Sequence, residues 1–409
     1  MSATFDNIRQ YLKKVQEITP LSPREVKILS TPQRIRKTTL KVEGKSFPAW
    51  RILFNDVLGP GKGGIRFHPQ ASQDEVVSLA FWMMIKNALA ELPYGGAKGA
   101  VKFDSKNASP QLQEAVSRKY IDAFYQVLGE NQDIPAPDVY TNAQIMAWML
   151  DEYEKKIGSH LPATITGKPL ELGGCQLRLK ATAQGGFYII KEMIKTFRLP
   201  KSQLKIAIQG FGNAGANLAQ MLEKDHLKIV AVSDSQGGTY QASGLKMAKI
   251  KKVKEKTGSV INYSPGQSIS NQEILELPVD ILILAALENQ ITENNVSQVK
   301  ANYIVEIANG PVTYQAEQEL FARKKIVVPD VLANAGGVIV SYFEWCQNRT
   351  GNILEMSYLA GLLKEKMNYN WKKLIVLQKE TSPPISLKTA AYLAAVKRIL
   401  AAEKLRGRI

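Results

Sequence analysis

Three lysines stand in surroundings suited to binding a charged ligand. Lys62 in GPGKGGIRFHP and Lys98 in PYGGAKGA are flanked by glycine and alanine, so backbone and ammonium can approach a ligand closely. Lys86 lies on an apolar stripe of a helix predicted over 72–91, with its head either in solvent or in a cleft. If these three lysines lie close together, they need a counter-anion. A dicarboxylate substrate would supply two negative charges.

One carboxylate is placed to work with these lysines. Asp138 lies in IPAPDVYTN, where the prolines stiffen the loop. A rigid carboxylate near a desolvated lysine is a plausible acid/base pair. The alternative role for Asp138 is to cap a helix predicted over 144–153, and the two roles are compatible.

A second constellation predicts a dinucleotide site. The motif GFGNAG lies between a predicted strand over 204–209 and a predicted helix over 216–224. The residues of this motif that we expect to face the ligand are Gly210, Gly212, Asn213 and Gly215. Glycines let the backbone approach a pyrophosphate, which the helix N-terminus attracts. Asp234 ends the next strand, where it can accept hydrogen bonds from a ribose diol. Because no arginine adjoins Asp234, NAD is favoured over NADP.

The surrounding pattern predicts an α/β fold with two domains. Apolar runs over 279–287, 303–309 and 326–330 are typical of buried parallel strands. We expect a Rossmann-like dinucleotide-binding domain over 185–333. We expect a substrate-binding and oligomerisation domain over 1–184, completed by 334–409, and an active-site cleft between the two domains.

Composition narrows the class of protein. The chain has 409 residues, a net charge of +16 and two cysteines. It has no metal-ligand spacing and no run long enough for a membrane span, and its first residues lack the apolar core of a signal peptide. We therefore expect a cytoplasmic protein without a metal. The lysine-rich stretch over 246–258 is either a solvated helix face or a nucleic-acid patch, and the lack of aromatics favours the former.

Eight stretches spread over nearly the whole chain form a specific set of motifs: GPGKGGIRFHP, LPYGGAKGA, IPAPDVYTNAQIMAWMLDEYE, ITGKPLELGG, QGFGNAG, AALENQIT, EIANGPVT and LANAGGVIVSYFEW. In these stretches the chain resembles the glutamate/leucine/phenylalanine/valine dehydrogenases, and within them the glutamate branch. The resemblance implies that Lys98 and Asp138 are catalytic and that Lys86 binds the substrate α-carboxylate. The further residues that it implies are Lys62 with Ser341 at the side-chain carboxylate, Asn334 near substrate and nicotinamide, Thr182 and Asn309 near the nicotinamide ribose and carboxamide, and Arg178 in a supporting role.

The resemblance also implies a reaction and an assembly. The reaction would be oxidative deamination of L-glutamate to 2-oxoglutarate and ammonium, with hydride transfer to NAD or NADP. The assembly would be a homo-oligomer, usually a hexamer. Two alternatives stay open: a dehydrogenase of another amino acid, and a family-like binding or regulatory subunit with low activity.

Three departures from the family pattern bear on activity. Ala100, Leu177 and Ala183 stand where glycine is usual. Glycine at such points normally serves close backbone approach or a positive φ angle. Since Thr182 lies between Leu177 and Ala183, we expect an intact fold and pyrophosphate site but weakened nicotinamide positioning and reduced turnover.

Overall fold

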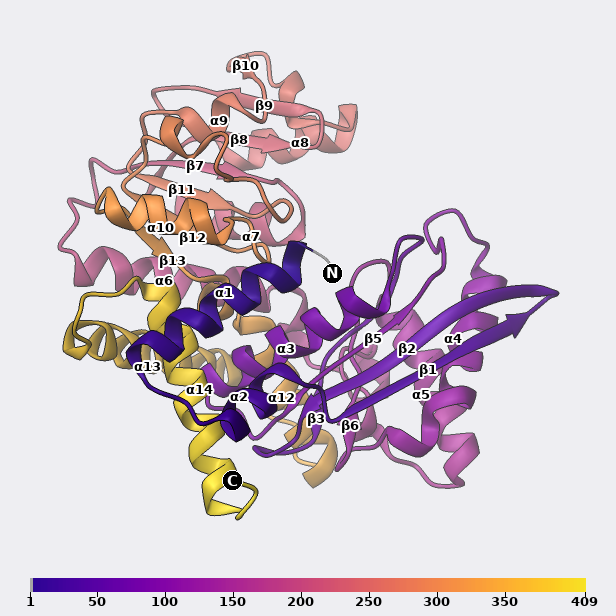
Figure 1. The fold of residues 1–409 in the computed structure, drawn as a ribbon. Helices are drawn as coiled ribbons and strands as arrows, with labels where there is room; N and C mark the ends of the chain where they lie inside the picture. Colours follow the sequence, from indigo (N-terminus) through magenta and orange to yellow (C-terminus); the bar gives the residue numbers. More distant parts are fainter. Residues whose placement is uncertain (1–2) are drawn as a thin grey trace. The chain divides into compact units, whose positions relative to one another are not determined.

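The chain forms two compact units in the computed structural model, which describes residues 3–409 and the side chains from Arg9 onward (Figure 1). The first unit comprises the residues up to Arg178, Val338–Gly361 and Tyr392–Ile409; the second comprises Leu179–Gly337 and Leu362–Ala391. The sequence-based division gave all of 334–409 to the first domain. Residues 362–391 instead belong to the second unit, where Trp371 is buried and donates a hydrogen bond to the Thr196 hydroxyl at 2.8 Å.

The first unit is built on a four-stranded sheet of order β1-β2-β5-β4. β4 and β5 are parallel, and the other two pairs are antiparallel. Its elements are α1 (Ala3–Ile18), α2 (Pro23–Ser30), β1 (Arg34–Val42), β2 (Lys45–Asn55), β3 (Gly61–Lys62), β4 (Ile65–Phe67), α3 (Gln73–Leu89), β5 (Gly96–Val101), α4 (Pro110–Phe124), β6 (Asp133–Ile134) and α5 (Ala143–Ile157). β3 pairs with β6 in a separate parallel ribbon, and α3 packs on β2 and β5.

Glycines decide how closely β5 packs. A Cβ atom on Gly96 would lie 2.4 Å from the backbone of Met84 in α3, and one on Gly99 would lie 2.3 Å from the Tyr120 hydroxyl in α4. Side chains of residues 96 and 99 point to opposite faces of a strand, so α3 and α4 cover opposite faces of β5. All six residues of β5 are buried as a result, including Lys98.

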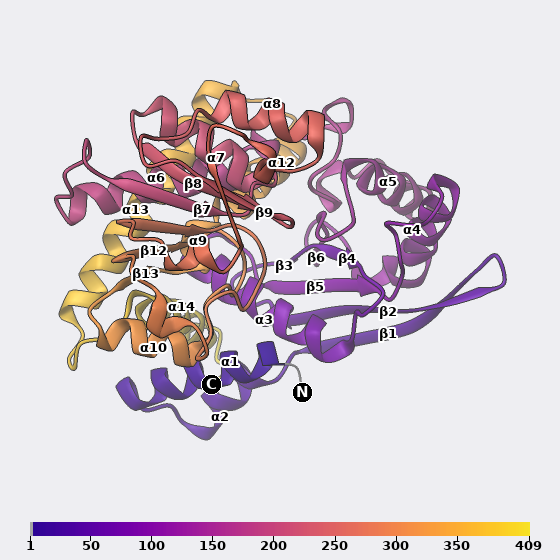
Figure 2. The same ribbon diagram turned by 90° about the horizontal axis from the view of Figure 1, so that it is seen from above.

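The second unit is a Rossmann-like α/β layer, as predicted (Figure 2). Its seven-stranded sheet has the order β10-β9-β8-β7-β11-β12-β13, with β8-β7-β11-β12-β13 parallel and β9 and β10 antiparallel. Its elements are α6 (Ala181–Thr196), β7 (Lys205–Gln209), α7 (Asn213–Lys224), β8 (Lys228–Asp234), β9 (Gly237–Tyr240), α8 (Met247–Thr257), β10 (Gln267–Ile269), α9 (Glu273–Glu276), β11 (Ile281–Leu284), β12 (Tyr303–Glu306), α10 (Tyr314–Ala322), β13 (Ile326–Val328) and α11 (Asp330–Ala333).

Three long helices complete the chain, and each has residues in both units. They are α12 (Gly336–Thr350), α13 (Met356–Glu380) and α14 (Leu387–Leu405). None of the helices formed by residues 3–409 is long and apolar enough to cross a bilayer.

Candidate active site

Lys98 and Asp138, the predicted acid/base pair, are in contact. The Lys98 ammonium lies 2.8 Å from Oδ1 of Asp138. Lys98 is 5% exposed at the centre of β5, whereas Asp138 lies at the end of the proline-stiffened loop. Gly64 lets that loop approach, since a Cβ atom there would lie 2.8 Å from Cβ of Asp138. Gly64, two residues after Lys62, therefore lets Asp138 approach the Lys98 ammonium.

A third charged residue, which the sequence reasoning missed, shares the carboxylate. Nε of Arg66 donates to Oδ2 of Asp138 at 3.1 Å, and the guanidinium also contacts Glu75. Arg66 lies in IRF of strand β4 beside β5, so it could have been noted in the motif GGIRFHP. The predicted capping role of Asp138 is wrong, because the Asn142 side chain caps α5.

The charges set the protonation of this pair. Burial lowers the pKa of Lys98, and the attraction of Asp138 offsets only part of that. Burial alone would raise the pKa of Asp138, but the positive charges of Lys98 and Arg66 hold its pKa well below the ordinary value. The pair thus presents an ionised carboxylate beside an ammonium that releases its proton more easily than lysine in water.

Lys62 forms a second buried cationic site. It is 1% exposed, and its ammonium donates to the Thr166 hydroxyl at 2.8 Å and to the carbonyls of Ile134 and Pro135 at 3.3 and 3.4 Å. Gly63, directly after β3, lets the chain pack against β5, since a Cβ atom there would lie 1.6 Å from the carbonyl oxygen of Ala97. Thr166 was not predicted, although it lies in the quoted stretch ITGKPLELGG.

The Lys62 site has an excess of positive charge. Burial holds the pKa of Lys62 well below its ordinary value, and Arg178 and Arg51 lower it further, whereas Glu344 and Asp133 oppose them. Arg51 and Asp133 form their own buried ion pair. A site in which cations outnumber carboxylates in this way favours the binding of an anion.

The remaining predicted substrate residues lie in both units. Lys86 is half-buried in the last turn of α3, and Ser341 is 2% exposed on α12 in the first unit. Asn334, expected near substrate and nicotinamide, lies in the second unit instead. Its amide nitrogen donates to Oδ1 of Asn309 at 2.9 Å, and no hydrogen-bond donor within the described residues reaches its own Oδ1. Asn334 and Asn309 thus form one polar group after β12.

The glycine loop after β7 fits a dinucleotide. Gly210 has a φ angle of 98°, and a Cβ atom on Gly215 would lie 1.9 Å from the Gly210 carbonyl oxygen, so the turn requires both. Gly212 precedes α7, and a Cβ atom there would meet nothing within 4 Å. The loop therefore leaves open space next to a helix N-terminus that attracts an anion. Asn213 is the first residue of α7.

Asp234 makes more hydrogen bonds and charge contacts within the protein than the sequence indicated. It accepts hydrogen bonds from the Ser259 hydroxyl at 2.8 Å and from backbone nitrogens of Val260 and Gln236 at 2.9 and 3.1 Å. The Lys254 ammonium lies 3.2 Å from its Oδ2. The preference for NAD rested on the absence of an arginine beside Asp234. Lys254 of α8 places a different cation there, which weakens that preference, while the other lysines of α8 are solvent-exposed.

Replacing Lys254 with methionine tests this arrangement. The change removes the cation and leaves Asp234 to repel a 2′-phosphate, so the KM for NADP should rise more than the KM for NAD, by about tenfold in ratio. Steady-state kinetics with both dinucleotides measure this ratio. Lys252→Met on the exposed face of α8 is the matched control. An unchanged ratio would contradict a role of Lys254 in cofactor choice.

The three departures from glycine do not require unusual backbone. Ala100, Leu177 and Ala183 are all absent from the residues with positive φ among those described, and all three are buried. Ala183 lies in the first turn of α6, next to Thr182. A positive φ angle, one of the two reasons for expecting weakened nicotinamide positioning, is therefore absent at these three positions.

Reversion to glycine should accordingly bring no gain. Leu177→Gly combined with Ala183→Gly removes a buried side chain and places glycine in a helix, which should cost about 3 kcal/mol or more of stability. We expect kcat to stay the same or fall and the melting temperature to drop. A several-fold higher kcat would show that the departures do limit turnover.

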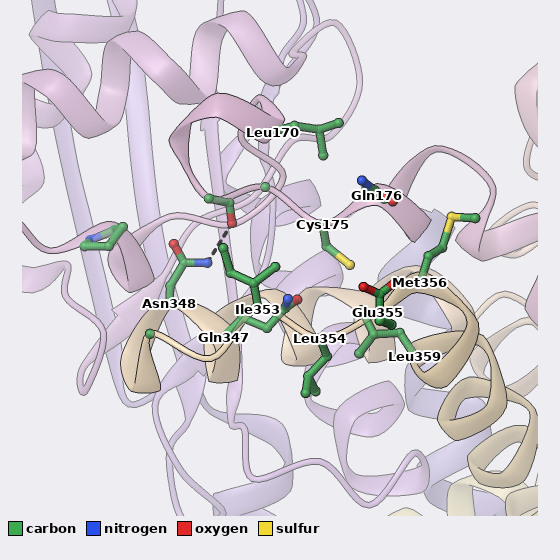
Figure 3. A pocket seen from close by; sticks show the side chains of 14 residues that line it. Leu170, Cys175, Gln176, Gln347, Asn348, Ile353, Leu354, Glu355, Met356 and Leu359 are labelled. Carbon is green, nitrogen blue, oxygen red and sulfur yellow. Dashed lines mark hydrogen bonds between the residues drawn. The ribbon is translucent and has the colours of Figure 1, made fainter.

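A separate hollow in the first unit holds none of the predicted residues. It has a volume of about 390 Å³ and lies between the turn around Cys175 and the α12–α13 connection, with Gln347 and Ile353 among its lining (Figure 3). The predicted chemistry is therefore not located in this hollow.

Comparison with known proteins settles the family. Residues 173–407 match the family model described as Glutamate/Leucine/Phenylalanine/Valine dehydrogenase, and residues 32–155 match the model of the Glu/Leu/Phe/Val dehydrogenase dimerisation domain. The chain belongs to the Glu/Leu/Phe/Val dehydrogenase family. The predicted resemblance is thereby confirmed.

Individual members of the family are similar over nearly their full length. An NADP-specific glutamate dehydrogenase of Synechocystis is 43% identical over 94% of this chain and 91% of its own, and a catabolic NAD-specific glutamate dehydrogenase of Bacillus subtilis is 40% identical over 93% and 90%. The structure of a hetero-hexameric glutamate dehydrogenase from Thermus thermophilus, in a Leu-bound form, has a TM-score of 0.93 at 30% identity and covers 99% of this chain and 97% of its own.

Proposed function

We propose that this protein catalyses the oxidative deamination of L-glutamate to 2-oxoglutarate and ammonium with NAD or NADP. The observation that supports glutamate most directly is the buried, hydrogen-bonded Lys62 in surroundings with excess positive charge. A side-chain carboxylate would neutralise this site, whereas an apolar side chain would leave the charge unpaired. The named relatives are glutamate dehydrogenases, which favours the same substrate.

The substrate would be held at both carboxylates. Lys62, with Thr166 fixing its ammonium, would bind the side-chain carboxylate with help from Ser341. Lys86 would bind the α-carboxylate. Such charge-assisted contacts are directional and about twice as strong as neutral ones, so they would fix the position of Cα as well as select the substrate.

Lys98 and Asp138 would perform the proton transfers. Asp138, ionised because of Lys98 and Arg66, would take a proton from the substrate amine and later return one to the departing nitrogen. Lys98, whose pKa is lowered by burial, would in its neutral form activate the water that attacks the iminium carbon. Its charged form would then stabilise the developing oxyanion.

The second unit would bind the dinucleotide, which when bound accepts the hydride from Cα. The Gly210–Gly215 turn and the N-terminus of α7 would hold the pyrophosphate, and Asp234 with Lys254 would face the adenosine ribose. The open acceptor Oδ1 of Asn334 fits the amide of a carboxamide group. Thr182 and Asn309 would contribute to the same end of the cofactor.

The assembly is proposed to be an oligomer of identical chains, in the form of a hexamer. The match to a dimerisation-domain model and the hexameric structure from Thermus thermophilus support oligomerisation. Mass determination in solution tests this composition: six identical chains are expected, whereas a requirement for a second kind of chain, as in that hetero-hexamer, would contradict it. Two unpaired cysteines, Cys175 and Cys346, support a reducing cytoplasmic location.

The proposed reaction is tested by its products. The protein is incubated with L-glutamate and NAD⁺ or NADP⁺, and reduced dinucleotide, 2-oxoglutarate and ammonium are measured separately. The three products should appear in equal amounts, and 2-oxoglutarate with ammonium should drive the reverse reaction. Binding of glutamate without formation of any of these products would instead favour a regulatory subunit. The structural observations described above do not support that alternative.

A further inference from the structure

A buried ion pair lies behind the Lys62 site and has no role in the mechanism described so far. The Lys168 ammonium contacts Oε1 of Glu344 at 2.8 Å, and both side chains are completely buried. Glu344 also accepts hydrogen bonds from the backbone nitrogens of Gly167, at 2.9 and 2.8 Å, and of Lys168, at 3.3 Å. One carboxylate thus binds the backbone and the side chain of one short turn.

That turn contains the residue that orients Lys62. Thr166 precedes Gly167, and its hydroxyl lies 2.8 Å from the Lys62 ammonium. Lys168 closes the turn by donating to the carbonyl of Ile165 at 2.6 Å. Gly167 has a φ angle of 81°, and a Cβ atom there would lie 2.4 Å from the ring of Pro137, so the turn is also held from its other side. The position of the Thr166 hydroxyl therefore depends on Glu344.

Glu344 acts on Lys62 through its charge as well. The charged groups that act on Lys62 are Arg178, Arg51, Glu344 and Asp133. Asp133 is bound by Arg51 and also contacts Arg34. Glu344 is thus the carboxylate with the largest effect on Arg178, and it raises the pKa of Lys62 against the larger effect of burial.

The sequence places Glu344 on the substrate side of its helix. Ser341 and Glu344 are three residues apart on α12, so they share one helix face. The helix that contributes the predicted serine contact therefore also supplies the carboxylate behind Lys62.

We propose that Glu344 is a positioning residue for recognition of the substrate side-chain carboxylate: it fixes the Thr166–Lys168 turn, and through that turn the Lys62 ammonium, in the charged and oriented form. This inference rests on the proposed function, since it assigns Glu344 to the side-chain subsite of glutamate. Lys168 is the counter-ion that makes a buried carboxylate possible at this position.

The test compares L-glutamate with L-norvaline, which has a methyl group in place of the side-chain carboxylate. In Glu344→Gln, the KM for glutamate should rise by about tenfold or more, while kcat and the kinetics of norvaline should change much less. Without the carboxylate, Lys62 loses its proton at lower pH. The decline of kcat/KM for glutamate with rising pH should therefore begin at lower pH than in the unaltered protein.

Two further variants separate positioning from folding. Glu344→Asp keeps the charge and should return the pH profile towards that of the unaltered protein. Glu344→Gln combined with Lys168→Met removes both members of the buried ion pair, so Lys168 is not left as an unpaired buried charge. The double variant should therefore fold even where the single variant does not, and it should show the same loss for glutamate. Glu403→Gln is the control, because Glu403 is an equally buried carboxylate of the first unit that binds Asn55 instead.

Three results would overturn the proposal: equal losses for glutamate and norvaline, an unmoved pH profile in Glu344→Gln, or failure of both the single and the double variant to fold. The unaltered protein is measured first. If it shows no preference for glutamate over norvaline, the proposed function fails. If it prefers glutamate but Glu344→Gln keeps that preference, only the role of Glu344 is rejected.

Discussion

Asp138→Asn should lower kcat for L-glutamate by about 100-fold or more with little change in KM, because it removes the proton shuttle and not a substrate contact. The amide cannot take the amine proton at any accessible pH. It also leaves the buried Lys98 ammonium without the carboxylate that lies 2.8 Å away, so the pKa of Lys98 should fall further.

Steady-state and single-turnover rates measure this effect, and Asp122→Asn serves as its control. Asp122 also pairs with lysines, Lys119 and Lys156, but at the surface of the first unit. The control should retain normal turnover. A rate for Asp138→Asn within a few-fold of the unaltered protein would remove Asp138 from the chemistry.

Lys62→Leu should reverse the substrate preference. Losing a charge-assisted contact of ~1.5–3 kcal/mol should lower kcat/KM for glutamate by roughly 10- to 100-fold, while norvaline and leucine should become relatively better substrates. Competition between glutamate and norvaline for one enzyme sample gives this ratio directly. Unchanged relative rates for glutamate and norvaline would show that Lys62 does not recognise the substrate side chain.

The same variant should be more stable than the unaltered protein. The pKa of Lys62 is lower in the folded chain than in the unfolded chain, so folding releases a proton and stability rises with pH between the two values. The destabilising effect of Lys62 is greatest below the folded pKa and vanishes above the unfolded one. The gain in melting temperature should therefore be larger at about pH 7 than at about pH 10.

The local motifs of the site could be predicted from the sequence. Glycines around Lys62 and Lys98 indicated close backbone approach. Gly63 and Gly96 do pack so closely against neighbouring backbone that a side chain at either position would not fit. The strand–glycine–helix order around Gly210 likewise predicted the loop before α7. Such patterns are readable because the physical requirement and the residues lie within one short stretch.

Contacts between distant stretches could not be predicted in this way. Lys254 reaches Asp234 from α8, and Glu344 reaches the turn at Gly167 from α12. No local sequence pattern predicts which lysine side chain of a basic helix contacts the rest of the protein, or which acidic side chain of a helix is buried. The sequence also could not show the backbone conformation of Ala183, which lies in the first turn of α6 without a positive φ angle.

The central claim is that the buried cations of the first unit select the side-chain carboxylate of glutamate. The most direct measurement is the kcat/KM of the unaltered protein for a panel of L-amino acids, followed as formation of NADH and NADPH. We expect glutamate to exceed norvaline by at least about tenfold. A preference for norvaline, leucine or phenylalanine, or no turnover of any amino acid with either dinucleotide, would contradict the account.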